Sequence, residues 1–282
     1  MIIFDYNQVA ISNLMEQIGS SKVSVDETLV RHMILNTIRT YVKKYKDSHG
    51  PEVIIACDNR HYWRREIFQH YKAGRKKARD SSGHDWSSIF DCLGKIKQEL
   101  KDSSPYKVID VDTCEADDII AVLAMKYSST QKVMILSSDK DFAQLQKFPN
   151  VEQYSPILKK NIKEPLPAAQ LKQLIIRGDK SDGIPNILSK DDTFVEGARQ
   201  KPITEAKIIN WMNQSPEEFC NDEMLRNFKR NEMLIDLTKI PETLKTSILD
   251  TYETAKGKTR QEFMNYMIAN RLKNLIEVID EF

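Results

Sequence analysis

Four short apolar runs, each followed by acidic residues, constrain the fold of this 282-residue chain more than any other feature of its sequence. The runs lie at residues 1–4, 52–57, 106–111 and 132–136 and are rich in Val and Ile, as strands covered on both faces are. Longer segments of helical periodicity separate them, such as residues 26–46, where apolar side chains recur at steps of three and four. Strands that alternate with helices are typical of a parallel sheet with crossover helices. We therefore predict the α/β class, with a mostly parallel central sheet flanked by helices.

The segment at residues 60–101 and the second half of the chain complete the predicted organisation. Residues 60–101 are too long for a simple link between strands, and Ser81-Ser82-Gly83 divides them, so we expect two helices inserted in the sheet domain. We predict an α/β domain at residues 1–164 and a mostly helical region at residues 165–282. Further helices are expected at residues 116–126, 140–147, 168–177, 204–213, 216–235 and 261–278, and a hairpin at residues 151–163.

Acidic residues stand at the carboxyl end of every predicted strand. Asp5 follows the first strand and Asp58 the second, Glu115, Asp117 and Asp118 follow the third, and Asp139 and Asp141 follow the fourth. The carboxyl ends of parallel strands meet at one edge of a sheet, so these carboxylates are expected to share a small volume. Like charges packed so closely take up protons or bind a cation, and oxygen ligands favour Mg²⁺ or Mn²⁺. So many acids suit two ions, the usual arrangement for phosphodiester hydrolysis. The alternative for each acid is a helix cap or first-turn residue.

A basic segment at residues 60–79 begins directly after Asp58 and would overhang the acidic edge. Its cations suit phosphates, and its aromatic side chains suit unpaired bases, on which they stack. Lys72 and Arg75 are three residues apart, hence on one face of a helix, where they could grip a scissile phosphate. The other residues predicted to bind substrate are Arg64, Arg65, Tyr71, Lys76, Lys77 and Arg79. The alternative is a solvated helix whose aromatic residues face the core.

The charge balance conceals these two patches. The chain has 42 Lys and Arg against 41 Asp and Glu, which argues against a histone-like or polyanion-coating protein. No apolar run approaches a membrane span and no signal peptide opens the chain, so we expect a cytoplasmic protein without membrane contact. The four Cys are far apart, which argues against a zinc module or a disulfide scaffold and predicts buried, reduced thiols.

Six motifs in order carry a resemblance to a known family. They are Asp5, Cys57-Asp58-Asn59, Tyr71-Lys72-Ala73-Gly74-Arg75, Glu115-Ala116-Asp117-Asp118, Ser138-Asp139-Lys140-Asp141-Phe142 and Gly178-Asp179-Lys180-Ser181-Asp182. In this order they resemble the structure-specific 5′-nuclease (flap endonuclease) family, and within it the phage ribonucleases H of the T-even type. The likeness extends nearly from end to end, including Tyr62-Trp63-Arg64-Arg65 and the closing Glu281-Phe282.

The resemblance implies a Mg²⁺-dependent 5′→3′ exonuclease and flap endonuclease that removes RNA primers and adjacent DNA during lagging-strand DNA replication. Its substrates would be branched or nicked DNA and RNA–DNA hybrids with a 5′ end. A single-strand DNA-binding protein and a sliding clamp would be its partners. The enzyme would be a phage-encoded monomer in the cytoplasm of the host cell.

The resemblance also assigns roles to residues of the site. Two Mg²⁺ ions, replaceable by Mn²⁺, would be held by Asp5, Asp58, Glu115, Asp117, Asp118, Asp139, Asp141, Asp179 and Asp182. Lys72 and Arg75 would contact phosphate from a helical arch at about residues 60–101, beside the aromatic Tyr71. Catalysis would rest on Lys72, Arg75, Asp5, Asp58, Asp117 and Asp139.

One departure and two rival functions stay open. Most of the family has a Gly-x-Gly hairpin that holds duplex and often K⁺ after the last motif, but residues 183–192 contain no such pair, so the resemblance does not extend to the K⁺ site. Duplex binding would fall to Lys190, Arg199, Lys201 and Lys207, whose alternative is ordinary surface charge. The enzymatic rival is a PIN-type endoribonuclease, against which the insert and the helical second half argue. The non-enzymatic rival is a DNA-junction binding protein whose acids are structural.

Overall fold

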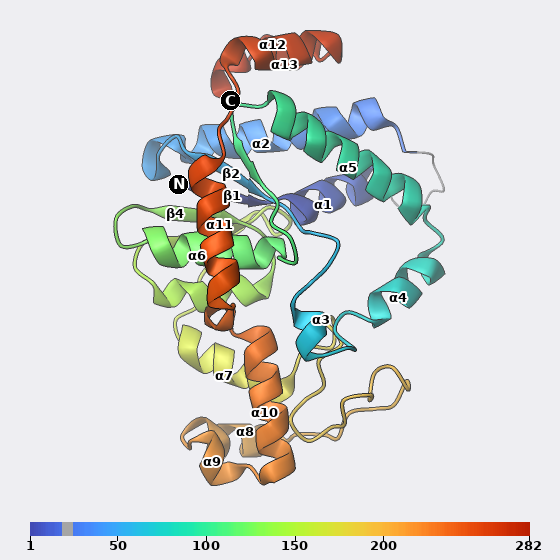
Figure 1. The fold of residues 1–282 in the computed structure, drawn as a ribbon, viewed down its shortest axis with the longest axis vertical. Coiled ribbons are helices and arrows are strands. Elements are labelled where there is room, and N and C mark those ends of the chain that lie inside the picture. Colours follow the sequence, from blue (N-terminus) through green and yellow to red (C-terminus); the bar gives the residue numbers. More distant parts are fainter. Residues whose placement is uncertain (19–24) are drawn as a thin grey trace.

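A six-stranded sheet forms the centre of the computed structural model, which describes residues 1–18 and 25–282 (Figure 1). The strands lie in the order β3-β2-β1-β4-β5-β6. Their bounds are β1 (Ile2–Asp5), β2 (Val53–Ala56), β3 (Lys107–Ile109), β4 (Val133–Leu136), β5 (Val151–Ser155) and β6 (Lys160–Ile162). Only the β5–β6 pairing is antiparallel among them. The predicted class, the four strands and the hairpin are confirmed.

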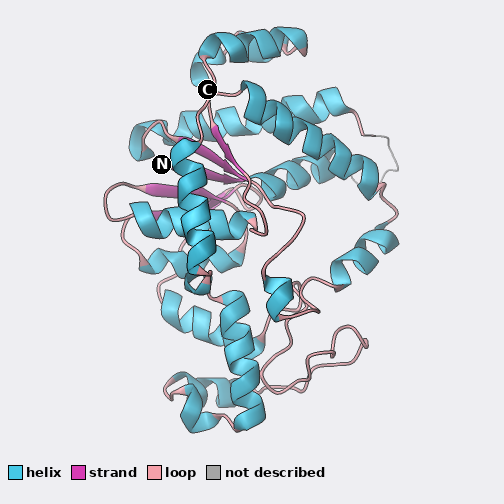
Figure 2. Ribbon diagram, viewed as in Figure 1, coloured by secondary structure: helices cyan, strands magenta, loops and turns pink. Residues whose placement is uncertain are grey.

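Helices cover both faces of the sheet, as Figure 2 shows. On one face Phe4 and Ile55 pack against α1 (Tyr6–Ile18), α2 (Glu27–His49) and α5 (Trp86–Ser103). The predicted helix at residues 26–46 is α2, which begins where the Asp26 carboxylate accepts hydrogen bonds from the N–H groups of Thr28 and Leu29. Helix α1 was not predicted.

The opposite face of the sheet carries Ile3 and Ile54, because side chains alternate along each strand. They pack in a cluster formed with α6 (Ala116–Tyr127), the 3₁₀ helix η1 (Lys140–Lys147) and α11 (Glu242–Thr254). Burial on both faces explains why the strands are continuously apolar. The prediction of a helix at residues 140–147 was right in position, although that helix is 3₁₀, and α11 was not predicted.

The chain between β2 and β3 contains α3 (Arg64–Ile67), α4 (Gly74–Ser82) and α5. Helices α4 and α5 are the predicted pair, separated at Gly83, whose left-handed φ of 77° ends α4. Helix α4 buries none of its side chains and stands away from the sheet in Figure 1. We call α3, α4 and their connections the arch.

A third apolar cluster joins the arch to the second half of the chain. Phe68 and Tyr71 of the arch pack there against α7 (Pro167–Arg177), α8 (Glu205–Met212), α9 (Pro216–Phe219) and α10 (Asp222–Ile235). The predicted single helix at residues 216–235 is two helices, because the Asn221 side chain caps a new helix at Met224 N–H. An irregular segment at residues 178–204 connects α7 to α8.

The end of the chain returns to the sheet. After η2 (Leu237–Lys239) and α11, the helices α12 (Arg260–Ala269) and α13 (Lys273–Ile276) and the turn η3 (Ile279–Glu281) join the core beside α2 and α5. The predicted helix at residues 261–278 is broken near Arg271, which has a φ of 56°. No helix in the described part of the chain has the length and apolar character to span a membrane. Of the four thiols, Cys220 is half-buried and the other three are buried.

Candidate active site

Four carboxylates from different strand ends share one pocket of about 560 Å³. Asp5 ends β1, and Asp58 follows the neighbouring strand β2. Asp117 lies in the first turn of α6, and Asp139 caps η1 after β4. The structure thus brings together the acids that the sequence placed at strand ends, as expected for the carboxyl edge of a parallel sheet.

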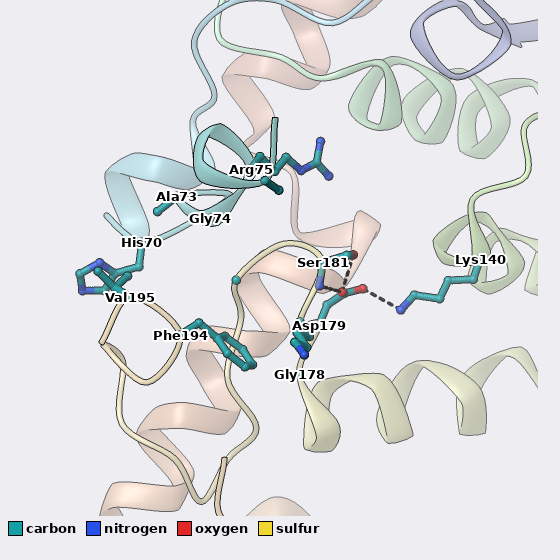
Figure 3. A pocket seen from close by; sticks show the side chains of 13 residues that line it. His70, Ala73, Gly74, Arg75, Lys140, Gly178, Asp179, Ser181, Phe194 and Val195 are labelled. Carbon is teal, nitrogen blue, oxygen red and sulfur yellow. Dashed lines mark hydrogen bonds and ion pairs between the residues drawn. The ribbon is translucent and has the colours of Figure 1, made fainter. Parts of the chain in front are cut away.

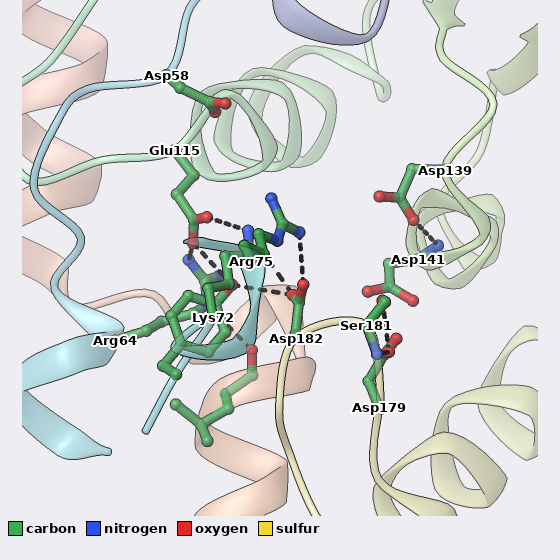
Figure 4. Close-up of polar contacts among 12 residues, drawn as sticks. Asp58, Arg64, Lys72, Arg75, Glu115, Asp139, Asp141, Asp179, Ser181 and Asp182 are labelled. Carbon is green, nitrogen blue, oxygen red and sulfur yellow. Dashed lines mark hydrogen bonds and ion pairs between the residues drawn. The ribbon is translucent and has the colours of Figure 1, made fainter. Parts of the chain in front are cut away.

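A second group of acids comes from the first turn of η1 and from the start of the 178–204 segment. Figure 4 shows Asp141, Asp179 and Asp182 near Asp139. Asp179 Oδ1 accepts hydrogen bonds from the N–H and the hydroxyl of Ser181 at 2.7 and 2.6 Å. Its Oδ2 is 2.8 Å from Lys140 Nζ. The turn that carries these acids is therefore fixed by their own hydrogen bonds.

Glycine is required at both ends of this turn. Gly178 has a φ of 67°, and a Cβ there would lie 2.3 Å from Ile184 O. Gly183 has a φ of 73°, and a Cβ would lie 3.0 Å from His70 O in the arch. Both positions disfavour any larger residue. The acidic turn and the arch are consequently in close backbone contact.

Burial and mutual repulsion make several of these carboxyls weak acids. Burial and the charge of Asp58 raise the pKa of Asp5 to about 7. Burial and the charges of Asp139 and Asp179 raise the pKa of Asp141 to about 8. Burial likewise raises the pKa of Asp117 and Asp139. For Asp179, burial acts in the same direction, but the hydrogen bonds from Lys140 and Ser181 outweigh it and lower the pKa.

This set of donors fits a hard divalent cation. Asp141 Oδ1 is buried and has no hydrogen-bond partner among the described residues, which is costly for a carboxylate. The groups around it are carboxylate oxygens, the ligands that Mg²⁺ prefers. In the described part of the chain, no three His, Cys, Asp or Glu side chains form a ready-made metal cage. Several of the acids are instead paired with cations of the protein.

Two cations at the base of the arch reach into the site. Lys72 is buried and its ammonium group contacts the Glu115 carboxylate, with Asp182 Oδ2 3.7 Å away. Burial alone would lower the Lys72 pKa, but Glu115 and Asp182 outweigh it and raise the pKa. Arg75 Nη2 lies 2.6 Å from Asp182 Oδ1. Figure 4 shows both contacts.

The backbone of Lys72 also ties the arch to the acidic turn. Its N–H donates to Asp182 O at 2.7 Å, and its φ of 57° is unusual for a residue other than glycine. Strain of this kind persists only where the surroundings hold it. The arch and the acidic turn are therefore positioned by each other.

Arg64, Asp118 and Tyr71 support the site from beneath. Arg64 is 2% exposed and Asp118 0% exposed, and their side chains are paired at 2.8 Å. Asp118 also accepts from Glu115 N–H at 2.9 Å in a capping box. Tyr71 is 2% exposed and donates to Glu115 Oε2 at 2.9 Å.

Three of the predicted site residues are held by other residues of the protein, and their roles toward metal or substrate stay predictions. Arg64 and Tyr71 are buried and hydrogen-bonded, and Asp118 is engaged as a cap, the alternative that the sequence left open. Trp63 is also buried. The remaining predicted substrate-binding residues are accessible: Arg65, Lys76 and Lys77 are exposed, and Arg79 is half-buried.

Three side chains that the sequence did not single out hold or border the acids. Asn7 Nδ2 donates to Asp58 Oδ2 at 2.6 Å, and Ser137 Oγ donates to Asp5 Oδ2 at 3.0 Å. Lys140 pairs with Asp179 as described above. The available signal was position: Asn7 lies two residues after Asp5, and Lys140 lies between two acids.

A second pocket, of about 670 Å³, lies on the other side of α4 (Figure 3). It is bordered by the arch at His70 and Gly74 and by the 178–204 segment at Phe194. Both pockets share Arg75 and Ala78, so α4 separates them. Space thus exists on both sides of the arch, next to the acids.

Family models match the two halves of the chain. Residues 13–173 match the 5′-3′ exonuclease N-terminal resolvase-like domain, and residues 167–282 match the C-terminal domain of T4 RNase H. The chain belongs to the 5′-3′ exonuclease family. The resemblance predicted from the six motifs is confirmed, and the protein is a nuclease.

Individual members of the 5′-3′ exonuclease family agree with this assignment. The ribonuclease H of enterobacteria phage T4 is 35% identical over 99% of this chain and 95% of its own length. The flap endonuclease Xni of Colwellia psychrerythraea is 34% identical over 44% of this chain and 42% of its own length. The T5 D15 protein co-crystallized with metal ions shares the fold, with a TM-score of 0.61 and 16% identity over 89% of this chain and 98% of that chain.

Proposed function

We propose that this nuclease is a Mg²⁺-dependent 5′→3′ exonuclease and flap endonuclease that removes RNA primers and adjacent DNA during lagging-strand DNA replication. The observation that carries the proposal is the placement of two groups of carboxylates directly beneath a cationic arch. Relatives named ribonuclease H and flap endonuclease support it. Branched or nicked DNA and RNA–DNA hybrids with a 5′ end are the proposed substrates.

The acids would hold two Mg²⁺ ions, for which Mn²⁺ could substitute. Asp5, Asp58, Asp117 and Asp139 form the first proposed ligand group, and Asp141, Asp179 and Asp182 form the second. Glu115 and Asp118, at the start of α6, complete the proposed set. When bound, such a pair of ions supplies an activated water and stabilises the leaving oxygen. A neighbouring T5 structure that contains DNA and metal ions supports this proposal.

The residues of the chain itself position the acids and the substrate. Asn7 and Ser137 orient the Asp58 and Asp5 carboxylates through hydrogen bonds. Lys72 and Arg75 neutralise acids while no substrate is present. We propose that they turn to the scissile phosphate once the acids are otherwise neutralised, because a phosphate oxygen then becomes their best partner.

The helical region at residues 165–282 is proposed to bind the duplex part of the substrate. Lys190, Arg199 and Lys201 are exposed on the 178–204 segment, and Lys207 is exposed on α8. Buried Asn227 holds this segment, because its Nδ2 donates to Ile187 O at 3.0 Å and to Ser189 O at 3.2 Å. The Asn227 amide thus fixes this segment, which lacks the Gly-x-Gly hairpin of the family. A single-strand DNA-binding protein and a sliding clamp remain proposed partners.

A comparison of substrates tests the proposed function. The intact protein is incubated with Mg²⁺ and a 5′-labelled flap duplex, an RNA-primed duplex or single-stranded RNA. The proposal expects cleavage of the first two, with 5′-phosphate and 3′-hydroxyl ends. Preferential cleavage of single-stranded RNA would favour a PIN-type endoribonuclease, and binding without cleavage would favour a junction-binding protein.

A further inference from the structure

Two aromatic side chains at the start of α5 share the pocket of the acids. Trp86 and Phe90 lie one helical turn apart, with ring centroids 5.5 Å apart and ring planes inclined by 35°. Phe90 is 43% exposed and Trp86 is half-buried, so both rings have free surface. Both line the pocket that Asp5 and Asp139 also line.

The aromatic pair is held in place by the arch, and Trp86 also packs against the edge of the core. The buried face of α5 is formed by Ile89, Leu93 and Ile96, and Trp86 and Phe90 lie beside that face. Trp86 Nε1 donates to Ser82 Oγ at 2.8 Å, at the end of α4. A second link comes from α4 as well, because the Arg79 guanidinium lies 5.5 Å from the centre of the Phe90 ring.

The pocket therefore has two chemically different parts. One part carries the four carboxylates that are proposed to hold metal. The other carries the two rings together with Ile11 of α1 and Ile157, which is 56% exposed. Arg75 and Arg79 also line this pocket and give it positive charge. A nucleotide matches this combination, since its phosphate is anionic and its base has two apolar faces.

We propose that Trp86 and Phe90 form a stacking site for an unpaired nucleobase of the 5′ strand, next to the phosphate that the acids cleave. The inference rests on the proposed function and adds a base-binding site to it. Stacking on aromatic rings is tolerant of sequence, so the site accepts any base. A paired base is enclosed in the duplex and cannot reach the rings. The site therefore selects a single-stranded 5′ end.

Binding measured without turnover isolates this site. The full chain is mixed, in EDTA, with a duplex that bears a three-nucleotide 5′ flap containing 2-aminopurine, with the same duplex carrying abasic flap residues, and with a flapless duplex. Stacking on the rings quenches 2-aminopurine in the wild-type complex. The double substitution Trp86→Leu and Phe90→Leu weakens binding of the base-containing flap by about tenfold and leaves the other two affinities unchanged.

Two controls accompany the Leu variants. Trp86→Phe keeps an aromatic face and retains base-dependent affinity, and Ile209→Ala alters an apolar side chain that is 66% exposed on α8. If the 2-aminopurine fluorescence of the flap duplex does not change when the wild type binds it, the inference is overturned, and no variant is needed for this test. An equal loss of affinity on all three duplexes, or no loss, also overturns it.

Cleavage with Mg²⁺ separates this inference from the proposed function. If the wild type cleaves the flap but the rings fail the binding tests, only the stacking site is lost. If the wild type cleaves none of the substrates, the proposed function fails, whatever the rings bind. Flap binding that does not depend on the bases of the flap contradicts the inference and would leave a segment of a partner protein as the occupant of the rings.

Discussion

Arg75 Nη2 of the arch lies 2.6 Å from Asp182 Oδ1 of the acidic turn, so a proposed phosphate-binding cation is paired with a proposed metal ligand. Lys72 with Glu115 repeats this relationship, and Lys140 likewise pairs with the proposed metal ligand Asp179. The protein thus supplies its own cations to acids that would otherwise repel one another. When metal binds to the acids and phosphate binds to the cations, each of these ion pairs within the protein has to break.

Replacing Lys72 by Met should destabilise the metal-free protein and increase the stabilisation by Mg²⁺. Loss of the ammonium leaves Glu115 buried with less compensation, which typically costs about 3–5 kcal/mol. Mg²⁺ then meets less competition from the protein. Thermal unfolding in EDTA and in Mg²⁺ measures both effects. Lys126→Met, at an exposed site on α6, is the matched control. An identical Mg²⁺-induced shift in wild type and variant would contradict the exchange of partners.

The combined change Lys72→Ala and Arg75→Ala should slow cleavage far more than it weakens duplex binding. Both side chains lie at the acids rather than on the surface proposed to hold the duplex. Removing charges that stabilise a transition state typically costs about 10²–10³ in rate. Single-turnover cleavage and equilibrium binding in EDTA separate the two quantities, with Lys126→Ala as the control. A loss confined to affinity would show that the pair only attracts DNA.

The metal-free protein should lose stability as the pH rises through neutrality. The folded pKa is about 7 for Asp5 and about 8 for Asp141, against an ordinary value of 3.8 for an aspartate side chain. The folded state therefore binds these protons more tightly than the unfolded state, and stability falls between about pH 4 and pH 8.

The matching variant is Asp141→Asn, which cannot ionise. In EDTA at pH 8 it should melt above the wild type, by roughly 2–4 °C for each kcal/mol gained, and the gain should vanish near pH 4. Mg²⁺ should stabilise the wild type more than the variant. A variant that melts lower at pH 8 would show that the Asp141 carboxylate is compensated within the metal-free protein.

The sheet and its acidic edge could be predicted because they depend on local patterns. Doubly buried strands are continuously apolar, and parallel pairing alone places Asp5, Asp58 and Asp139 at one edge. Helix α1 could be predicted in the same way, since the apolar residues Val9, Ala10 and Leu14 share one face at helical spacing, and this face is buried.

The orientation of individual side chains could not be predicted in the same way. Trp63 and Tyr71 are buried whereas Phe90 is exposed, and all three lie in segments that mix apolar and polar residues. Partners distant in the sequence decide the outcome. Arg64, for example, is buried because Glu115 and Asp118 accept its hydrogen bonds. No pattern within residues 60–79 contains that information.

The most direct test is a Mg²⁺ titration of cleavage on a 5′-labelled flap duplex, with wild type, Asp139→Asn and the exposed control Asp250→Asn. We expect cleavage by the wild type and the control to rise from zero and saturate with Mg²⁺. The Asp139→Asn variant should bind the duplex as the wild type does but cleave it at least about 10²-fold more slowly. Cleavage without divalent metal, or unchanged turnover by Asp139→Asn, would contradict a metal-dependent site at these acids.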